Sequence, residues 1–236
     1  MSRFVLIPGA GGAGWYWHRV IPLLEAAGHQ AVAIDLPADD ETAGLPEYAD
    51  LAAAAARQDG GAGGAGGAGG AGGTVLVAQS LGGFTAPLVC DRVPVDLLVL
   101  LNAMIPEPGE TAGAWGDNTG ANAARDAAAA AGGYPPGYDL ETYFLHDVPP
   151  EIAAAGEPYQ KPEAEIAFSQ PCDIKEWPGV PTRVVAGRDD RFFPAAFQRR
   201  VARDRLGLET DEVPGGHLAA LSYPAELADR LLAYLA

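Results

Sequence analysis

Short apolar runs alternate along this chain with longer segments of helical periodicity. Six segments are candidate strands: residues 4–7, 30–36, 74–78, 95–101, 182–186 and 209–213. The first, third and fourth are apolar at nearly every position, and a strand that is apolar on both faces needs a covering layer on each of them. Helices are expected between the strands, at 20–27, 46–58, 81–92 and 195–206, and at the end of the chain at 224–235. The pattern predicts an α/β fold: a doubly wound, mostly parallel, six-stranded sheet.

Two segments interrupt this alternation. Residues 60–73 repeat Gly-Gly-Ala without a polar side chain, which predicts a flexible loop. The fourth and fifth strands are separated by a stretch too long for a simple crossover. We therefore expect residues 107–179 to form an inserted lid over the carboxyl edge of the sheet, with weak helices at 121–131 and 149–155. Residues 1–106 and 180–236 would then form the core.

Charge and cysteine content narrow the range of partners. The chain has 15 Lys+Arg against 31 Asp+Glu, a formal net charge of −16, which disfavours nucleic acid and anionic lipid. Cys90 and Cys172 are too few for a disulfide framework or a Cys-rich metal site. We expect two free thiols, with one long-range disulfide as the alternative. Neither a signal peptide nor a membrane-spanning run is evident. These features predict a cytoplasmic protein without metal, cofactor or membrane.

Ser80 lies at a sharp turn between a strand and a helix, in the sequence TVLVAQSLGG of residues 74–83. Ala78 and Gly82 complete the small-x-Ser-x-Gly pattern of a nucleophile elbow, in which small residues let strand and helix pass closely. The turn presents the hydroxyl at the carboxyl end of the strand, beside the free N–H groups of a helix N-terminus. A solvent-exposed turn serine is the alternative. The strand and helix on either side favour a nucleophile.

Four histidines could supply a base for Ser80. His217 follows the sixth strand and therefore reaches the carboxyl edge, where open α/β sheets bind ligands. His18 is expected to be structural and His29 to lie at the surface. His146, in the lid, is expected to pack there or face solvent, with substrate contact as the alternative. His217 is the candidate base.

Two adjacent carboxylates could orient His217. Asp189 and Asp190 both follow the fifth strand. The pattern Gly187-x-x-Asp, with Pro194 four residues later, favours Asp190. Asp189 is then a solvated neighbour or the partner of a nearby arginine.

Backbone N–H groups on two segments are candidates for an oxyanion hole. One belongs to Leu81, directly after Ser80, and the other to Ala10, in the glycine-rich loop after the first strand. That loop also fits the Gly-x-Gly-x-x-Gly pattern of a dinucleotide site at residues 9–14. Residues 15–17 are Trp-Tyr-Trp, where such a site needs small residues, so the oxyanion interpretation is favoured.

The chain as a whole resembles the α/β-hydrolase superfamily, and within it the branch of plant methylesterases, hydroxynitrile lyases and many actinobacterial hydrolases. The resemblance rests on residues 4–14, 17–29, 31–37, 78–83, 98–106, 187–194 and 215–218. It implies Ser80 as nucleophile, Asp190 as acid and His217 as base, in the chain order of this superfamily. Two departures are Pro8-Gly9 in place of the usual His-Gly, and a first strand that corresponds to the third of the family.

Three functions are compatible with these residues. The favoured one is a serine hydrolase that cleaves a small-to-medium carboxylic ester through an acyl-enzyme. A cyanohydrin lyase is the second; the plant lyases carry Thr where Gly9 stands and Lys after the catalytic histidine, whereas Leu218 follows His217 here. The third is a hydrolase-like receptor with a vestigial triad, which the intact triad disfavours. Four side chains are candidates for lining the substrate cavity: Trp17, Tyr143, His146 and Leu218. The sequence does not specify an oligomeric state.

Overall fold

The computed structural model describes residues 1–57 and 72–235. They form one six-stranded sheet in the order β2-β1-β3-β4-β5-β6, and every neighbouring pair is parallel. The strands are β1 (Arg3–Ile7), β2 (Gln30–Ala33), β3 (Thr74–Gln79), β4 (Leu97–Leu101), β5 (Thr182–Gly187) and β6 (Thr210–Val213). The predicted fold class is confirmed, and the sheet is wholly parallel. The predicted loop at 60–73 lies, up to residue 71, outside the described residues.

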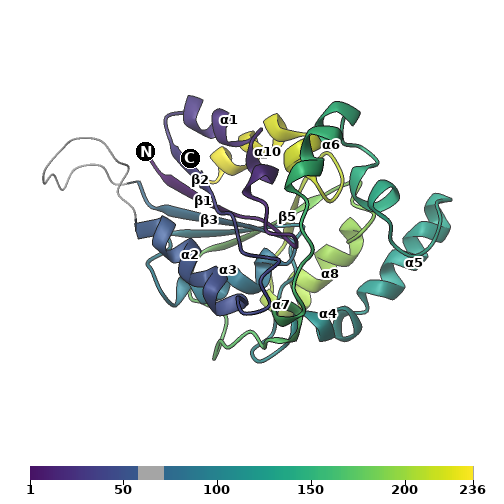
Figure 1. Ribbon diagram of the computed structural model, residues 1–236, viewed down its shortest axis with the longest axis horizontal. Helices are drawn as coiled ribbons and strands as arrows, with labels where there is room; N and C mark the ends of the chain where they lie inside the picture. Colours follow the sequence, from purple (N-terminus) through teal and green to yellow (C-terminus); the bar gives the residue numbers. More distant parts are fainter. Residues whose placement is uncertain (58–71, 236) are drawn as a thin grey trace, which may run out of the picture.

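Helices cover both faces of the sheet (Figure 1). The structure has these helices in its core: η1 (Gly14–Trp17), α1 (Ile21–Ala26), α2 (Leu45–Arg57), α3 (Gly82–Cys90), α8 (Ala195–Leu206), α9 (Ala219–Ser222) and α10 (Pro224–Ala233). One hydrophobic cluster packs α2, α3 and α8 on the sheet, and a second packs η1, α1, α9 and α10 on the opposite face. Along β1, Val5 and Ile7 enter the first cluster and Phe4 and Leu6 the second. Burial on both faces explains why the central strands are apolar throughout.

The edge strand β2 is shorter than the segment 30–36 that the sequence predicts. It pairs with β1 and ends at Ala33, and the N–H of Ile34 makes one more bond to β1, at the Leu6 carbonyl, before the chain leaves the sheet. The N–H of Leu36 donates instead to the carbonyl of Gly12 at 2.8 Å, in the loop after β1. The end of the apolar run therefore supports this loop rather than extending the sheet.

The segment between β4 and β5 carries four helices and two short helical turns. They are α4 (Ala112–Thr119), α5 (Ala121–Gly132), η2 (Glu141–Leu145), α6 (Pro150–Gly156), η3 (Glu157–Tyr159) and α7 (Glu165–Ser169). Of these six elements the sequence predicts only α5 and α6. α4 begins with Thr111, whose side chain accepts the N–H of Ala114, and Gly120 ends it with a left-handed conformation at φ 70°.

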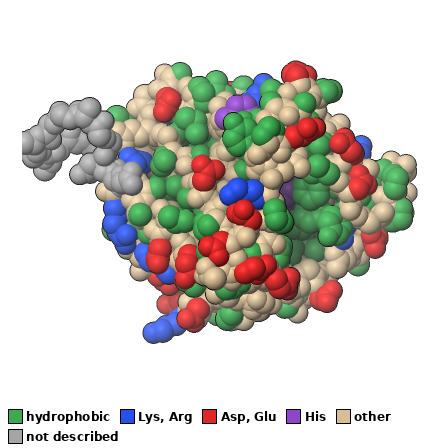
Figure 2. Space-filling view, in the orientation of Figure 1, with side chains coloured by type: hydrophobic (Ala, Val, Ile, Leu, Met, Phe, Trp, Pro, Cys, Tyr) green, Lys and Arg blue, Asp and Glu red, His purple; other side chains and the backbone are tan. Residues whose placement is uncertain are grey.

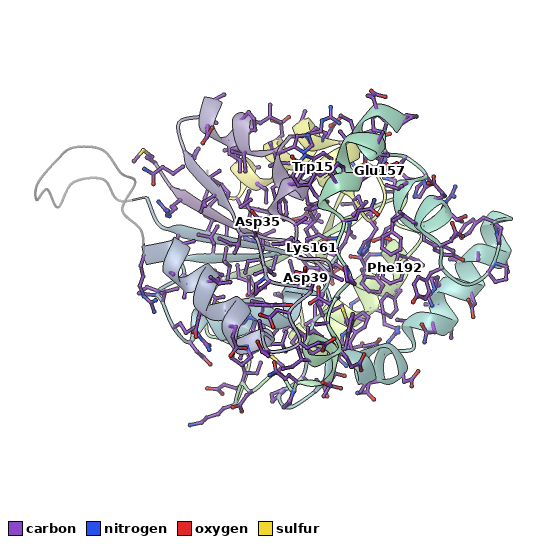
Figure 3. The ribbon with its side chains drawn as sticks, viewed as in Figure 1. Trp15, Asp35, Asp39, Glu157, Lys161 and Phe192 are labelled. Carbon is purple, nitrogen blue, oxygen red and sulfur yellow. The ribbon has the colours of Figure 1, made fainter. Side chains whose placement is uncertain are left out.

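Two ion pairs join this segment to the core. Glu110 and Arg205 form a buried, bidentate pair with contacts of 2.5 and 2.9 Å. Lys161 pairs with Asp39 at 3.1 Å, and the two labelled side chains lie next to each other in Figure 3. Residues of this segment, Phe144 and Phe168 among them, line the same cavity as Ser80 and His217.

Two further findings concern the membrane and the cysteines. No helix in residues 1–57 and 72–235 combines the length and apolarity needed to cross a bilayer. Cys90 and Cys172 are free thiols, as predicted.

Candidate functional site

Ser80 lies where β3 turns sharply into α3. Its backbone has φ 50°, a left-handed conformation that costs energy for a residue with a side chain. The turn leaves no room for a side chain at either of the next two glycines. A Cβ at Gly82 would lie 2.7 Å from the carbonyl oxygen of Pro8, and one at Gly83 would lie 2.0 Å from that of Met104. Small residues after Ser80 are therefore a steric requirement of the elbow.

The structure brings Ser80, His217 and Asp190 into one hydrogen-bonded line. Ser80 Oγ is 3.0 Å from His217 Nε2, and His217 Nδ1 is 2.8 Å from Asp190 Oδ2. All three are buried: His217 is 1% exposed, Asp190 4% and Ser80 8%. With the imidazole proton on Nδ1, Nε2 is free to accept the serine proton. This is the geometry of a nucleophile, a base and an orienting carboxylate.

Four donors hold the Asp190 carboxylate in place. Oδ1 accepts the N–H groups of Phe192 and Phe193, each at 2.8 Å. Oδ2 accepts from His217 and from Gln198 Nε2, the latter at 3.1 Å. The neighbouring Asp189 is exposed and accepts only a 3.3 Å bond from the N–H of Gly215. The structure therefore places Asp190, and not Asp189, behind His217.

Asn102 joins the two loops that carry Asp190 and His217, and no pattern in the sequence singled it out. It is fully buried at the carboxyl end of β4 and has φ 46°. Its Oδ1 accepts from the Gly187 N–H at 2.6 Å and from Gln198 at 3.2 Å. Its Nδ2 donates to the carbonyls of Gly216 and His217, both at 3.1 Å. The sequence signal that could have identified Asn102 is its place as a polar residue directly after the wholly apolar strand β4.

Aromatic rings surround the imidazole of His217. Phe144, Phe192 and Phe193 meet it edge-on, with ring centroids 5.3, 5.0 and 5.1 Å from that of His217. These rings keep bulk water away from the base. In such an environment the hydrogen bonds between Ser80, His217 and Asp190 are stronger than in water.

The predicted oxyanion donors lie on the wall of the same cavity. Ala10 and Leu81 both line it beside Ser80. Across residues 1–57 and 72–235, neither backbone N–H donates to a protein acceptor. The loop passes close to the serine, since a Cβ at Gly9 would lie 2.8 Å from the Ser80 Cβ. Both N–H groups are thus available for a ligand oxygen.

Glu163, in the segment between β4 and β5, binds the loop after β1 that contains Ala10. Its Oε2 accepts the Gly11 N–H at 2.7 Å, and its Oε1 accepts the Tyr48 hydroxyl at 2.8 Å. Burial raises the pKa of this carboxyl above its ordinary value. The residue lies in a stretch without regular periodicity, so no sequence pattern indicated this role.

A cavity of about 790 Å³ opens over Ser80 and His217. Figure 2 shows this face hollowed on its right side, with hydrophobic side chains gathered around the hollow. The lining includes Trp15, Tyr16, Leu81, Phe144, Phe168, Phe192, Leu218 and Leu221. Leu218 therefore lines the cavity, as the sequence predicts. In the described chain no group of three or more His, Cys, Asp or Glu side chains is arranged to hold a metal.

Two predicted lining residues, Trp17 and Tyr143, are misplaced and require correction, whereas His146 has the packing position expected of it rather than the alternative substrate contact. Trp17 is fully buried in the core below α1, because the tight turn of η1 points its neighbours Trp15 and Tyr16 into the cavity instead. Tyr143 is also fully buried, and its hydroxyl donates to the Pro135 carbonyl at 2.7 Å. His146 packs against the loop that carries His217, where burial lowers its pKa.

The model of the alpha/beta hydrolase family matches residues 4–230 of the chain. A probable esterase of Oryza sativa subsp. indica is 36% identical over 48% of this chain and 43% of its own length, so the match spans less than half of either protein. Methylesterase 1 of Arabidopsis thaliana is 23% identical over 98% of this chain and 95% of its own.

Solved structures share the fold. Polyneuridine aldehyde esterase superposes with a TM-score of 0.76 at 18% identity, covering all of both chains. A pyrethroid hydrolase from Sphingobium faniae JZ-2 superposes with a TM-score of 0.71 at 20% identity, over 99% of this chain and 96% of that one. The elbow, the wholly parallel sheet and the match over nearly the whole sequence agree, and the chain belongs to the alpha/beta hydrolase family.

Proposed function

We propose that this protein is a serine hydrolase that cleaves a small-to-medium carboxylic ester. The observation that carries the proposal is the 3.0 Å contact between Ser80 Oγ and His217 Nε2, at a strained turn beside two available N–H groups. The names of the relatives, a probable esterase and a methylesterase, support an ester as substrate. The mostly apolar cavity of about 790 Å³ matches the size of sites for small organic molecules.

The reaction follows from the geometry of the site. His217 Nε2 takes the proton of Ser80 as Oγ attacks the ester carbonyl, and Asp190 stabilises the imidazolium that forms. The N–H groups of Ala10 and Leu81 donate to the carbonyl oxygen as it becomes negative. His217 then returns the proton to the departing alcohol, which leaves an acyl group on Ser80. A water that His217 deprotonates releases the acid and restores the enzyme.

Ser80→Ala tests this proposal. The variant should no longer react with a fluorophosphonate probe and should lose about 10⁴-fold or more of ester turnover, because the triad acts as a unit. Ser169→Ala is the matched control, since that serine is exposed and lies in α7, away from the elbow. Labelling of Ser80→Ala at the wild-type rate would disprove the proposal. A wild-type protein that neither labels nor turns over esters would support a binding protein instead.

The lyase alternative makes a different prediction. A Thr at position 9 would place its Cβ 2.8 Å from the Ser80 Cβ and 2.4 Å from Gln79 Oε1, so this loop and its neighbours would have to shift to hold that residue. Leu218 beside His217 offers no cation to stabilise a departing cyanide. We expect hydrolysis of small nitrophenyl esters and no cyanide release from mandelonitrile above background. Cyanide release at a rate comparable to ester turnover would favour the lyase.

A further inference from the structure

A buried arginine stands on the inward face of α5. The buried positions of this helix are Ala121, Arg125 and Ala129, which recur at every fourth residue. Two small apolar residues thus flank a long cation that is only 8% exposed. A stripe that served packing alone would be apolar throughout, because burial of a charge is costly unless the charge is paired.

Arg125 has almost none of the partners that a buried guanidinium needs. Its one hydrogen bond within the described chain runs from Nη2 to Asn122 Oδ1 at 2.8 Å. Its Nε is buried without an acceptor, and no described carboxylate lies within ion-pair distance. Arg205, whose side chain is also largely buried, shows the contrast, since Glu110 binds it in a bidentate pair. The guanidinium of Arg125 therefore has donors to spare.

The unpaired cation lines the cavity that contains Ser80. Its Cζ lies 5.2 Å from the ring centre of Phe192 and 5.5 Å from that of Tyr138. The same Phe192 ring lies 5.0 Å from the imidazole of His217. The guanidinium is consequently at most about 10 Å from the imidazole, the sum of the two Phe192 distances. Figure 3 shows Phe192 between the sheet and helix α5, which lies at the right of the view.

We propose that Arg125 binds a carboxylate carried by the substrate at the end remote from the ester. The substrate class would then be half-esters of dicarboxylic acids. This inference rests on the proposed ester hydrolysis. A guanidinium fork matches a carboxylate in a bidentate geometry, and the flanking rings exclude the water that would compete for it. The bound carboxylate takes no part in bond making: water cleaves the ester, and the alcohol and the free dicarboxylate leave.

A pair of matched esters tests the inference. Turnover of monomethyl adipate and of dimethyl adipate is followed by titration of the released acid. Wild-type protein should prefer the charged half-ester by about 10-fold or more in kcat/KM, the effect of one hydrogen-bonded charge. Arg125→Gln should remove this preference and leave turnover of the neutral diester within a few-fold of wild type. Arg125→Lys should keep part of the preference.

Arg183→Gln is the matched control. This arginine also stacks on an aromatic ring, with Cζ 5.6 Å from the centre of Tyr234, but it does not line the cavity. The control should keep the full preference for the half-ester.

A second measurement covers the case in which Arg125→Gln does not fold. Adipamate, which carries one carboxylate, should protect wild-type Ser80 from the fluorophosphonate probe, whereas uncharged adipamide should protect it about 10-fold less well. Hydrolysis of the diester without preference for the half-ester, or equal protection by the two amides, would overturn the inference and leave the proposed function standing. Absence of both labelling and turnover would overturn the two together.

Discussion

Asp190→Asn is the sharpest test of the site, because the structure dictates which way the new amide must face. Oδ1 of Asp190 accepts two backbone N–H groups at 2.8 Å, so the amide oxygen must stay there. The amide nitrogen then replaces Oδ2 and donates toward Nδ1 of His217, at the present 2.8 Å. Nδ1 has to become an acceptor, and the imidazole proton moves to Nε2. In that tautomer His217 cannot take the proton of Ser80.

The expected loss follows from this change of tautomer and from the lost stabilisation of the imidazolium. It is about 10⁴-fold in kcat, or about 5.5 kcal/mol at about 1.4 kcal/mol per tenfold change. Initial rates on a nitrophenyl ester measure it, and circular dichroism checks that the variant is folded.

Asp189→Asn is the control that the chain itself provides. Asp189 is exposed and does not contact His217, so its change should stay within about threefold, the scale of a surface substitution. Equal losses in the two variants, or a larger loss for Asp189→Asn, would refute the assignment of Asp190. A loss below about tenfold for a folded Asp190→Asn would refute the tautomer argument.

Three further predictions concern residues around the triad. Asn102→Ala should lower kcat at least tenfold with little change in KM and reduce the free energy of unfolding by about 2 to 3 kcal/mol, because buried groups in two loops lose their hydrogen-bond partners. Steady-state kinetics measure the first effect and urea unfolding the second, and an unchanged kcat would contradict the prediction. Glu163→Gln should change the pH dependence of stability. Because burial raises the pKa of Glu163, the free energy of unfolding of wild type should fall relative to that of the variant as pH rises from 4.5 through the folded-state pKa. Urea unfolding of both proteins across that range measures this difference in unfolding free energy, and a constant or rising difference would contradict the prediction. Glu110→Gln should cost about 3 to 5 kcal/mol of unfolding free energy, because Arg205 is left buried without a charged partner; a loss below about 1 kcal/mol by the same measurement would show that the pair is dispensable.

The hydrogen-bonded group of Ser80, His217 and Asp190 could be located from sequence because the strands of a parallel sheet end at one common edge. Ser80, Asp190 and His217 each follow a strand, and the carboxyl ends of parallel strands share one edge. Apolar runs mark the central strands clearly, so the edge can be recognised without the structure. Edge strand β2 was less predictable, since the apolar run continues past its end at Ala33, and Leu36 bonds to the loop after β1 rather than to a strand.

The residues that sequence reasoning missed act through single tertiary contacts. Asn102 and Glu163 are isolated polar positions, which have no period to detect. Helix α4 contains two glycines and has poor intrinsic propensity; its Trp115 holds it in place by packing on Phe193 and Phe197. Trp17 was misassigned because a short turn does not reveal which of three adjacent aromatic residues faces inward.

The bond from Gly11 to Glu163 bears on how proteins of this shape can be re-engineered. One way to transfer substrate preference between family members is to exchange the segment 107–179 and keep the rest of the chain unchanged. In this chain such an exchange would remove Glu163, whose carboxylate accepts hydrogen bonds from both the Gly11 N–H and the Tyr48 hydroxyl. In a chimera the loop after β1 would lose this hydrogen bond, unless the new segment placed an acidic residue at the position of Glu163. The segment 107–179 and the rest of the chain are therefore not independent units, and Glu163 is the contact to preserve in any such exchange.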